Sequence, residues 1–127
     1  RGGQARSCVA DLRAEVPIHD YLSETLKAVT TTVGTAEDAR RLAQAVLAQR
    51  LAACVQIEAI TSHYRWEGAL HEDGEWRLVC KTFPRRWMGL ALLQAQHPYT
   101  LPQLVVQPLQ ASAAYADWVR QETQGAW

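Results

Sequence analysis

The chain has 127 residues, of which 48% are hydrophobic, which is enough for one buried core and too little for two ordinary domains. Thirteen basic and thirteen acidic residues give a net charge of zero. There is thus no overall positive field to attract nucleic acid, and we expect no nucleic-acid partner. No stretch approaches the roughly 18 consecutive apolar residues of a membrane-spanning helix, so we expect no membrane partner either.

The cysteine content indicates a reducing compartment. Cys8, Cys54 and Cys80 are odd in number and widely spaced, which is not the pattern of a dense disulfide framework. We therefore interpret all three as thiols and expect a cytoplasmic protein.

The first regular element is predicted to begin near Leu26. We assign residues 1–25 to an N-terminal extension, because their apolar residues follow no sustained period, and residues 26–127 to one folded domain. From Leu26 to Val33 the β-branched run of threonines and valine predicts a strand.

A helix is predicted directly after Gly34. Thr35 is a favourable N-cap, and Glu37 and Asp38 place negative charge in the first turn, where the helix dipole favours it. The apolar residues then recur with helical spacing on one face: Ala39, Leu42, Ala43, Val46 and Leu47.

A long hairpin is predicted next. Alternation from Cys54 to Trp66 indicates a half-buried strand, and a slip of its apolar phase near Ala59 predicts a bulge or bend. Polar residues over Gly68–Gly74 predict the turn, and Trp76 to Lys81 predict the returning strand.

The last third predicts a helix, a strand and a helix. Pro84 is suited to the first turn of a helix that Pro98 ends, and Leu104 to Val106 supply a strand before Pro108. A short terminal helix follows around Tyr115. The order β, α, β, β, α, β predicts an α+β, ferredoxin-like split βαβ fold with an extra C-terminal helix.

Several local motifs resemble the CutA divalent-cation tolerance family. They are Leu51-Ala52-Ala53-Cys54, Tyr64-Arg65-Trp66-Glu67-Gly68, Glu75 leading to Lys81-Thr82, His97-Pro98-Tyr99 with Pro102, and Tyr115 with Trp118. The resemblance implies a ferredoxin-like subunit, a homotrimer held by sheet edges, and a physiological link to copper and other divalent cations.

The sequence departs from that family pattern at three positions. Thr31 stands where some members have a cysteine, Ala69 replaces a common lysine, and Gln103 replaces a usual glutamate. A thiol and a carboxylate are thereby lost, so we expect weaker copper binding than in members that retain them.

Four residues are candidate metal ligands: His97, His71, Cys54 and Cys80. Thiolates favour soft ions such as Cu(I), and imidazole favours borderline divalent ions. Each candidate also has a structural interpretation, because cysteines on strands pack as small hydrophobes, acidic turns are usually solvated, and a histidine at a helix end interacts with the dipole. The cofactor prediction is therefore copper or another divalent cation, with no organic cofactor.

Six further residues are predicted to line a polar cleft between subunits: Tyr64, Trp66, Glu67, Glu75, Lys81 and Tyr99. The alternative is an interface of charge pairs and aromatic anchors, without a ligand.

We predict that the protein is not an enzyme. The sequence has no phosphate-binding glycine loop, no HExxH and no nucleophile-base grouping. The alternatives are a trimeric signalling module similar to the PII regulators, which bind a small effector between subunits, and a hydrolase or isomerase that uses Glu75 and Lys81 as acid and base.

Overall fold

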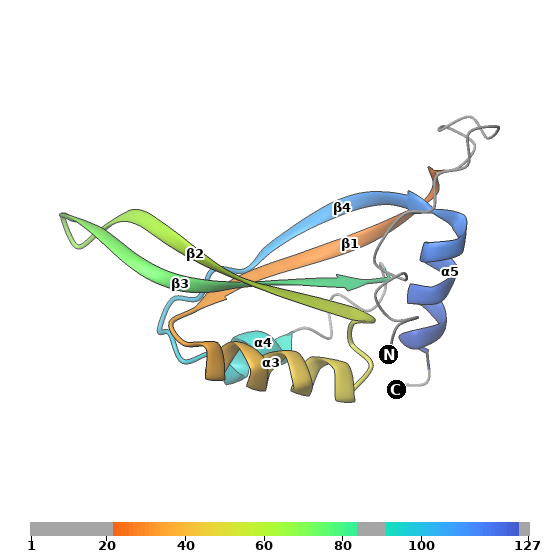
Figure 1. Cartoon of the computed structure of the whole chain (residues 1–127), viewed down its shortest axis with the longest axis horizontal. Coiled ribbons are helices and arrows are strands. Elements are labelled where there is room, and N and C mark those ends of the chain that lie inside the picture. The colour runs from red at the N-terminus through yellow and green to blue at the C-terminus, as the bar shows by residue number, and fades with distance from the viewer. Residues whose placement is uncertain (1–21, 84–90, 125–127) are drawn as a thin grey trace.

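Four strands form one antiparallel sheet in the computed structural model, which describes residues 22–83 and 91–124 (Figure 1). The strand order is β2-β3-β1-β4. This is the split βαβ arrangement, so the predicted ferredoxin-like α+β fold with an extra C-terminal helix is confirmed. The elements are β1 Leu22–Val33, α3 Ala36–Ala48, β2 Cys54–Trp66, β3 Ala69–Thr82, α4 Ala91–Gln96, β4 Val105–Ser112 and α5 Ala113–Glu122.

The helices begin where the sequence supplies caps. Thr35 Oγ1 accepts a hydrogen bond from the Asp38 amide at 3.0 Å, as predicted for α3. Ser112 Oγ does the same for the Tyr115 amide at the start of α5, at 3.2 Å. None of the helices in the described ranges has the length and apolarity needed to cross a membrane. The predicted helix start at Pro84 lies outside the described residues.

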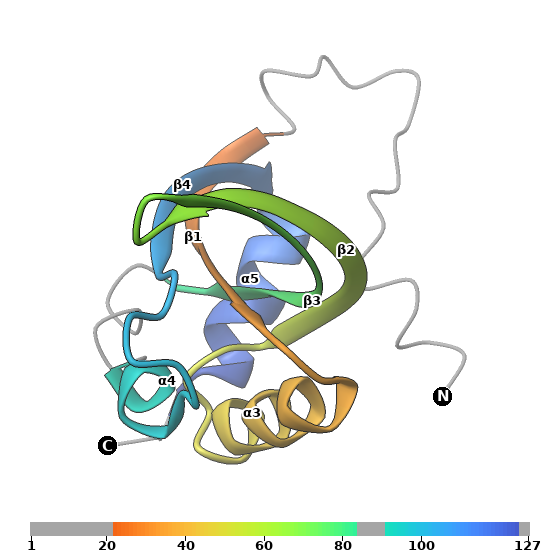
Figure 2. The ribbon, with the colours of Figure 1, turned by 90° about the vertical axis from the view of Figure 1, so that its left-hand side faces the viewer.

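The two faces of the sheet carry separate apolar clusters. Val29 and Cys80 belong to the larger cluster, which lies under α3. Leu26 is out of phase with Val29 along β1, and it packs instead with Ala116 and Val119 of α5. Helix α3 therefore covers one face, with α4 beside it (Figure 2). Helix α5 packs against one end of the other face.

The hairpin of β2 and β3 is longer and more regular than predicted. Its register is continuous from Cys54 opposite Lys81 to Trp66 opposite Ala69, so the predicted bulge or bend near Ala59 is not a bulge. The predicted turn over Gly68–Gly74 is wrong as well. Glu67 and Gly68 form the turn, with φ of 50° and 79°, the left-handed values that a two-residue hairpin turn requires.

The far half of this hairpin forms an arm that projects beyond the rest of the domain (Figure 1). We use the term arm for residues 60–75. Most of its residues are exposed, so neither face has to alternate between apolar and polar residues. That freedom explains why the apolar phase slips although the register does not.

Strands β1 and β4 are both longer than predicted. Strand β1 begins at Leu22, opposite Ser112, so the last residues of the predicted 1–25 extension belong to the sheet. Strand β4 continues through Pro108 to Ser112. A proline is tolerated there because β4 is an edge strand, which has a ladder partner on one side only.

Two fully buried threonines differ in their hydrogen bonding, which leads to a stability prediction. Thr82 Oγ1 donates to the Leu51 carbonyl at 2.7 Å, whereas Thr31 Oγ1 has no partner among the described residues. We expect Thr31→Val to stabilise the fold by about 1 kcal/mol, because it removes a buried unsatisfied hydroxyl. We expect Thr82→Val to destabilise it by about 1 kcal/mol, because the Leu51 carbonyl loses its donor. Urea unfolding measures the free energy of unfolding of both variants. A change in the same direction for both would contradict the prediction.

Candidate functional site

A cleft of about 1040 Å³ lies between the arm and the loop that joins α4 to β4. Strands β1, β2 and β3 supply one wall, and residues 98–103 supply the other. The lining residues are Thr32, Gly34, Ser62, His63, Tyr64, Trp66, Asp73, Gly74, Glu75, Pro98, Tyr99, Thr100, Leu101, Pro102 and Gln103.

His97 fixes the loop that forms the second wall. Its Nδ1 accepts a hydrogen bond from the Tyr99 amide at 3.0 Å, so Nδ1 carries no proton. The ring proton of the neutral imidazole is then on Nε2, which donates to the Thr32 carbonyl at 2.7 Å. His97 is buried, and it ties the start of the loop to β1.

Two phenol–carboxylate pairs lie in the cleft. The Tyr64 hydroxyl donates to Asp73 Oδ2, and the Tyr99 hydroxyl donates to Glu75 Oε2 at 2.8 Å. The hydrogen bond to Asp73 raises the pKa of Tyr64, and burial followed by the hydrogen bond to Glu75 raises the pKa of Tyr99. Both phenols therefore stay protonated at neutral pH and act as hydrogen-bond donors.

Close packing holds the two tyrosine rings in place. The Tyr64 ring stacks on His71 with centroids 5.3 Å apart. The Tyr99 hydroxyl lies 3.2 Å from the position that a β-carbon on Gly34 would occupy. A side chain at position 34 would therefore require the Tyr99 hydroxyl, which donates to Glu75, to shift.

Four of the six predicted cleft residues line this cleft, namely Tyr64, Trp66, Glu75 and Tyr99. Glu67 lies in the turn at the tip of the arm. Lys81 is six residues beyond Glu75, about 20 Å along the strand, where its Nζ donates to Gln56 Oε1 at 2.8 Å. An acid-base pair of Glu75 and Lys81 is therefore not formed in this chain.

Sequence reasoning did not place Asp73 or residues 100–103 in the cleft, although it included Tyr99 of the same loop. Asp73 was assigned to a turn, but it is in β3 two residues before Glu75, on the same face of the strand. The i, i+2 spacing of the two carboxylates was the available signal. It becomes informative only once the turn is placed at Glu67 and Gly68.

The four predicted metal ligands do not converge on one metal site among the described residues. Both ring nitrogens of His97 are engaged in hydrogen bonds, and His71 stacks on Tyr64. The pairing of Cys54 with Lys81, and of Cys80 with Val55, directs the two thiols to opposite faces of the sheet. Both are buried, and burial raises the pKa of Cys80 to about 12, which disfavours the thiolate a metal needs. No group of three His, Cys, Asp or Glu within residues 22–83 and 91–124 could hold a metal ion.

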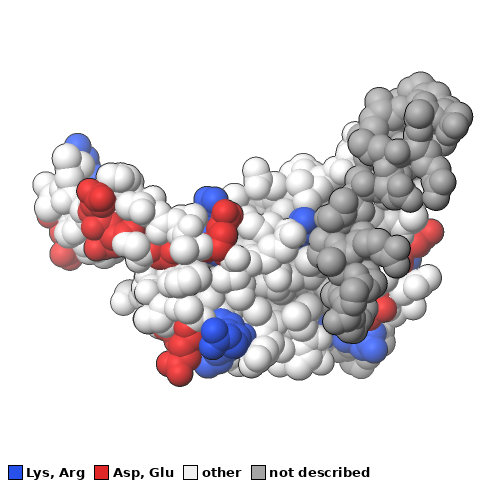
Figure 3. Space-filling view, in the orientation of Figure 1, with Lys and Arg blue, Asp and Glu red and all other residues white. Residues whose placement is uncertain are grey.

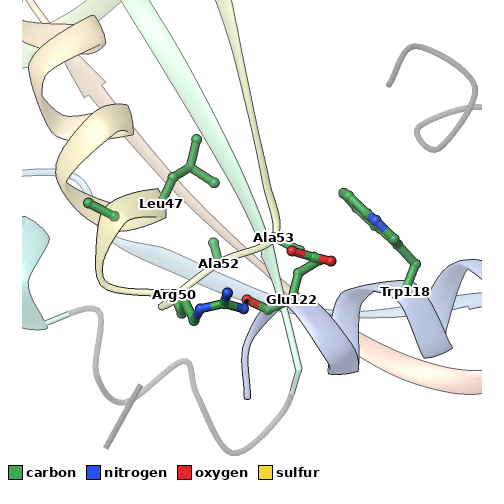
Figure 4. Close-up of a pocket in the computed structure, with 7 residues that line it drawn as sticks. Leu47, Arg50, Ala52, Ala53, Trp118 and Glu122 are labelled. Carbon is green, nitrogen blue, oxygen red and sulfur yellow. Dashed lines mark hydrogen bonds between the residues drawn. The ribbon is translucent and has the colours of Figure 1, made fainter. Parts of the chain in front are cut away.

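A second hollow of about 380 Å³ lies where the end of α3 meets α5 (Figure 4). Arg50, with a left-handed φ of 56°, reaches across to donate to the Glu122 carbonyl at 3.2 Å. Trp118 stands at the other side of the hollow. These contacts join the end of α3 to the last turn of α5, so we interpret the hollow as a packing junction.

The fold and the cleft define a small ferredoxin-like α+β domain with a candidate ligand site between a β-hairpin arm and a loop. Residues 27–122 match the family model described as CutA1 divalent ion tolerance protein. The chain therefore belongs to the CutA1 family, as the local motifs indicated.

Individual relatives agree with this assignment. The divalent-cation tolerance protein CutA of Thermus thermophilus is 42% identical over 98 residues, covering 75% of this chain and 95% of that protein. The structure of CutA from Synechococcus elongatus has a TM-score of 0.76 at 41% identity, covering 80% of this chain and 93% of that one. A further structure of the Synechococcus protein, complexed with a Bis-Tris molecule, has a TM-score of 0.72 at 41% identity and covers 79% and 95%.

Proposed function

We propose that the protein acts in divalent-cation tolerance as a homotrimer that binds copper or another divalent cation weakly. The trimer is proposed because of three large side chains on the arm. The exposed fractions of Tyr64, Trp66 and Leu70 are 42%, 46% and 75%. Large apolar groups projecting on a hairpin are expected to pack against another copy. The edges at β2 and β4 also lack a strand partner within the described chain, and sheet edges are common contact surfaces.

The assembly is tested by its mass in solution. We expect light scattering to give three times the 14.2 kDa chain mass at micromolar concentration. Trp66→Ala should lower that mass, since it removes an arm anchor. Leu47→Ala is the matched control, because Leu47 is similarly exposed, at 40%, but belongs to α3. A monomeric parent, or equal effects of the two variants, would refute the proposal.

Weak cation binding is proposed for the carboxylates of the cleft. Asp73 and Glu75 supply the oxygen ligands, and the described residues offer no third His, Cys, Asp or Glu that could complete a site with them. Oxygen-poor coordination of this kind favours low affinity. In this proposal the protein has no catalytic step, and the protonated phenols position the carboxylates. We also propose a cytoplasmic location, consistent with buried thiols at Cys54 and Cys80.

Two substitutions test whether the metal ion binds in the cleft or at strand β1. Gln103 lines the cleft, so Gln103→Glu adds a third carboxylate and should strengthen Cu²⁺ binding by about tenfold, or about 1.4 kcal/mol. Thr31 is fully buried, so a thiol introduced by Thr31→Cys is inaccessible and should leave the affinity unchanged. This expectation replaces the sequence-based one, in which both positions mattered. Calorimetry at constant pH measures both, and a gain with Thr31→Cys alone would contradict the cleft assignment.

A further inference from the structure

His97 is a buried histidine whose two ring nitrogens have opposite roles. Only 9% of the residue is exposed. Its Nδ1 accepts the hydrogen bond from the Tyr99 amide, and its Nε2 donates to the Thr32 carbonyl. A protonated imidazole carries a hydrogen on both nitrogens and can accept on neither. The hydrogen bond from the Tyr99 amide therefore exists only while the ring is neutral.

A protonated His97 would have no carboxylate partner on the side of α3 and α4. Neither of its two hydrogen-bond partners is a carboxylate. Arg41 of α3 donates at 3.3 Å to the carbonyl of Gln96, the residue before His97, and Asp38 is paired with the same arginine. Figure 3 shows acidic and basic side chains lying side by side where α3 begins. The charge that α3 presents at this point is therefore positive or already paired.

On the β3 side of His97 the charged group is Glu75. Its carboxylate accepts from the Tyr99 hydroxyl at 2.8 Å, and the rings of Tyr99 and His97 have centroids 4.9 Å apart. The partner of Glu75 is thus the phenol and not the imidazole, and β1 contributes only the Thr32 carbonyl. A buried charge without a paired countercharge is costly, so these contacts favour the neutral ring.

The same tie positions the loop of residues 98–103. Tyr99 is bonded to His97 through its amide and to Glu75 through its hydroxyl, so it links the loop to β1 on one side and to β3 on the other. If the amide loses its acceptor, the phenol is no longer held in place from the His97 side. Histidine is the side chain that ordinarily changes its charge between about pH 5 and pH 8.

From these contacts we infer that His97 is a pH-sensitive switch of the loop. The neutral ring ties residues 98–103 to β1, and protonation of Nδ1 in mildly acidic solution releases them together with Tyr99. The inference goes beyond the proposed role in cation tolerance. It depends on neither the trimer nor metal binding, because both partners of His97 belong to its own chain and neither is Asp73 or Glu75.

Amide hydrogen exchange of the full-length protein, followed by NMR at about pH 7.5 and about pH 5.5, tests the switch. The quantity compared is the protection factor, in which the ordinary pH dependence of exchange is divided out. On acidification we expect the protection factor of the Tyr99 amide to fall at least about tenfold, and those of the β1 and β3 amides to change less than about twofold. An unchanged protection factor at Tyr99, or an equal fall throughout β1 and β3, would overturn the inference.

His97→Asn is the matched variant, because asparagine does not titrate. Its side-chain oxygen can accept from the amide two residues ahead, as in an Asx-turn. The protection factor of the Tyr99 amide in this variant should change less than about twofold between the two pH values. His63→Asn, the same substitution at an exposed histidine of the arm, should leave the response of the parent unchanged. A response that persists in His97→Asn, or that disappears in His63→Asn, would contradict the assignment to His97.

The protonation state of the ring can also be measured in the parent, without any variant. Nitrogen chemical shifts of the imidazoles distinguish a protonated nitrogen from an unprotonated one. We expect His97 to carry its proton on Nε2 at the higher pH and to be protonated on both nitrogens at the lower pH, with the Tyr99 amide resonance moving over the same range. A proton on Nδ1 at the higher pH, or a ring that stays neutral at the lower pH, would also overturn the inference.

Discussion

Leu78→Ala should lower the free energy of unfolding by about 3 kcal/mol, as expected for a leucine truncated in a close-packed core. Leu78 is fully buried in β3, an interior strand of the sheet, and belongs to the cluster under α3. The surrounding side chains come from both the sheet and the helix, so filling the cavity would require both to move. Urea unfolding measures the loss.

Leu101→Ala is the matched control for this substitution. Leu101 is 70% exposed in the loop beside the cleft, so the same truncation should cost less than about 0.5 kcal/mol. Similar costs at the two positions would mean that burial within one chain does not determine the stability of this domain.

His97→Ala should also destabilise the fold by about 3 kcal/mol, because it combines a buried cavity with the loss of two hydrogen bonds. The Tyr99 amide loses its acceptor, and the Thr32 carbonyl loses a donor at 2.7 Å. The loop that forms one wall of the cleft is then no longer tied to β1. Chemical denaturation measures the stability.

Amide exchange distinguishes this local role from a general loss of stability. Relative to the parent, His97→Ala should raise the exchange rate of the Tyr99 amide more than the exchange rates of the amides in β1 and β3. The reason is that the Tyr99 amide has lost its acceptor. His63→Ala, at an exposed histidine of the arm, should change neither the stability nor that exchange rate. Uniform acceleration of exchange in His97→Ala would argue against a specific tie between the loop and the sheet.

Local sequence signals were sufficient to predict most of the fold. The cap at Thr35 and the apolar spacing from Ala39 to Val46 are short-range properties, and the helix forms where they predict it. The order of elements then limits the topology, because a split βαβ unit has few ways to bury one face of a sheet under helices. The family motifs pointed to the same fold independently.

The details of the hairpin were decided by the tertiary structure. Periodicity reports register only where one face of a strand is buried, and the arm lies beyond the helices, where neither face is covered. The polar run after Gly68 therefore resembled a turn, although Glu67 and Gly68 already complete one. Similarly, Pro108 resembled the end of a strand because sequence does not reveal that β4 lies at the edge of the sheet.

The sequence by itself determined the residue types of the site, and the tertiary structure decided which of them meet. Tyr64, Glu75 and Tyr99 were predicted to line a cleft between subunits, and that cleft stays a prediction. Within one chain the three residues line a common cleft because the loop that His97 holds against β1 faces the arm. Lys81, predicted with them, lies far along the same strand, since strand residues separate by about 3.3 Å each. Cys54 and Cys80 are directed apart by the pleat of the sheet, so their shared chemistry does not converge on one ion.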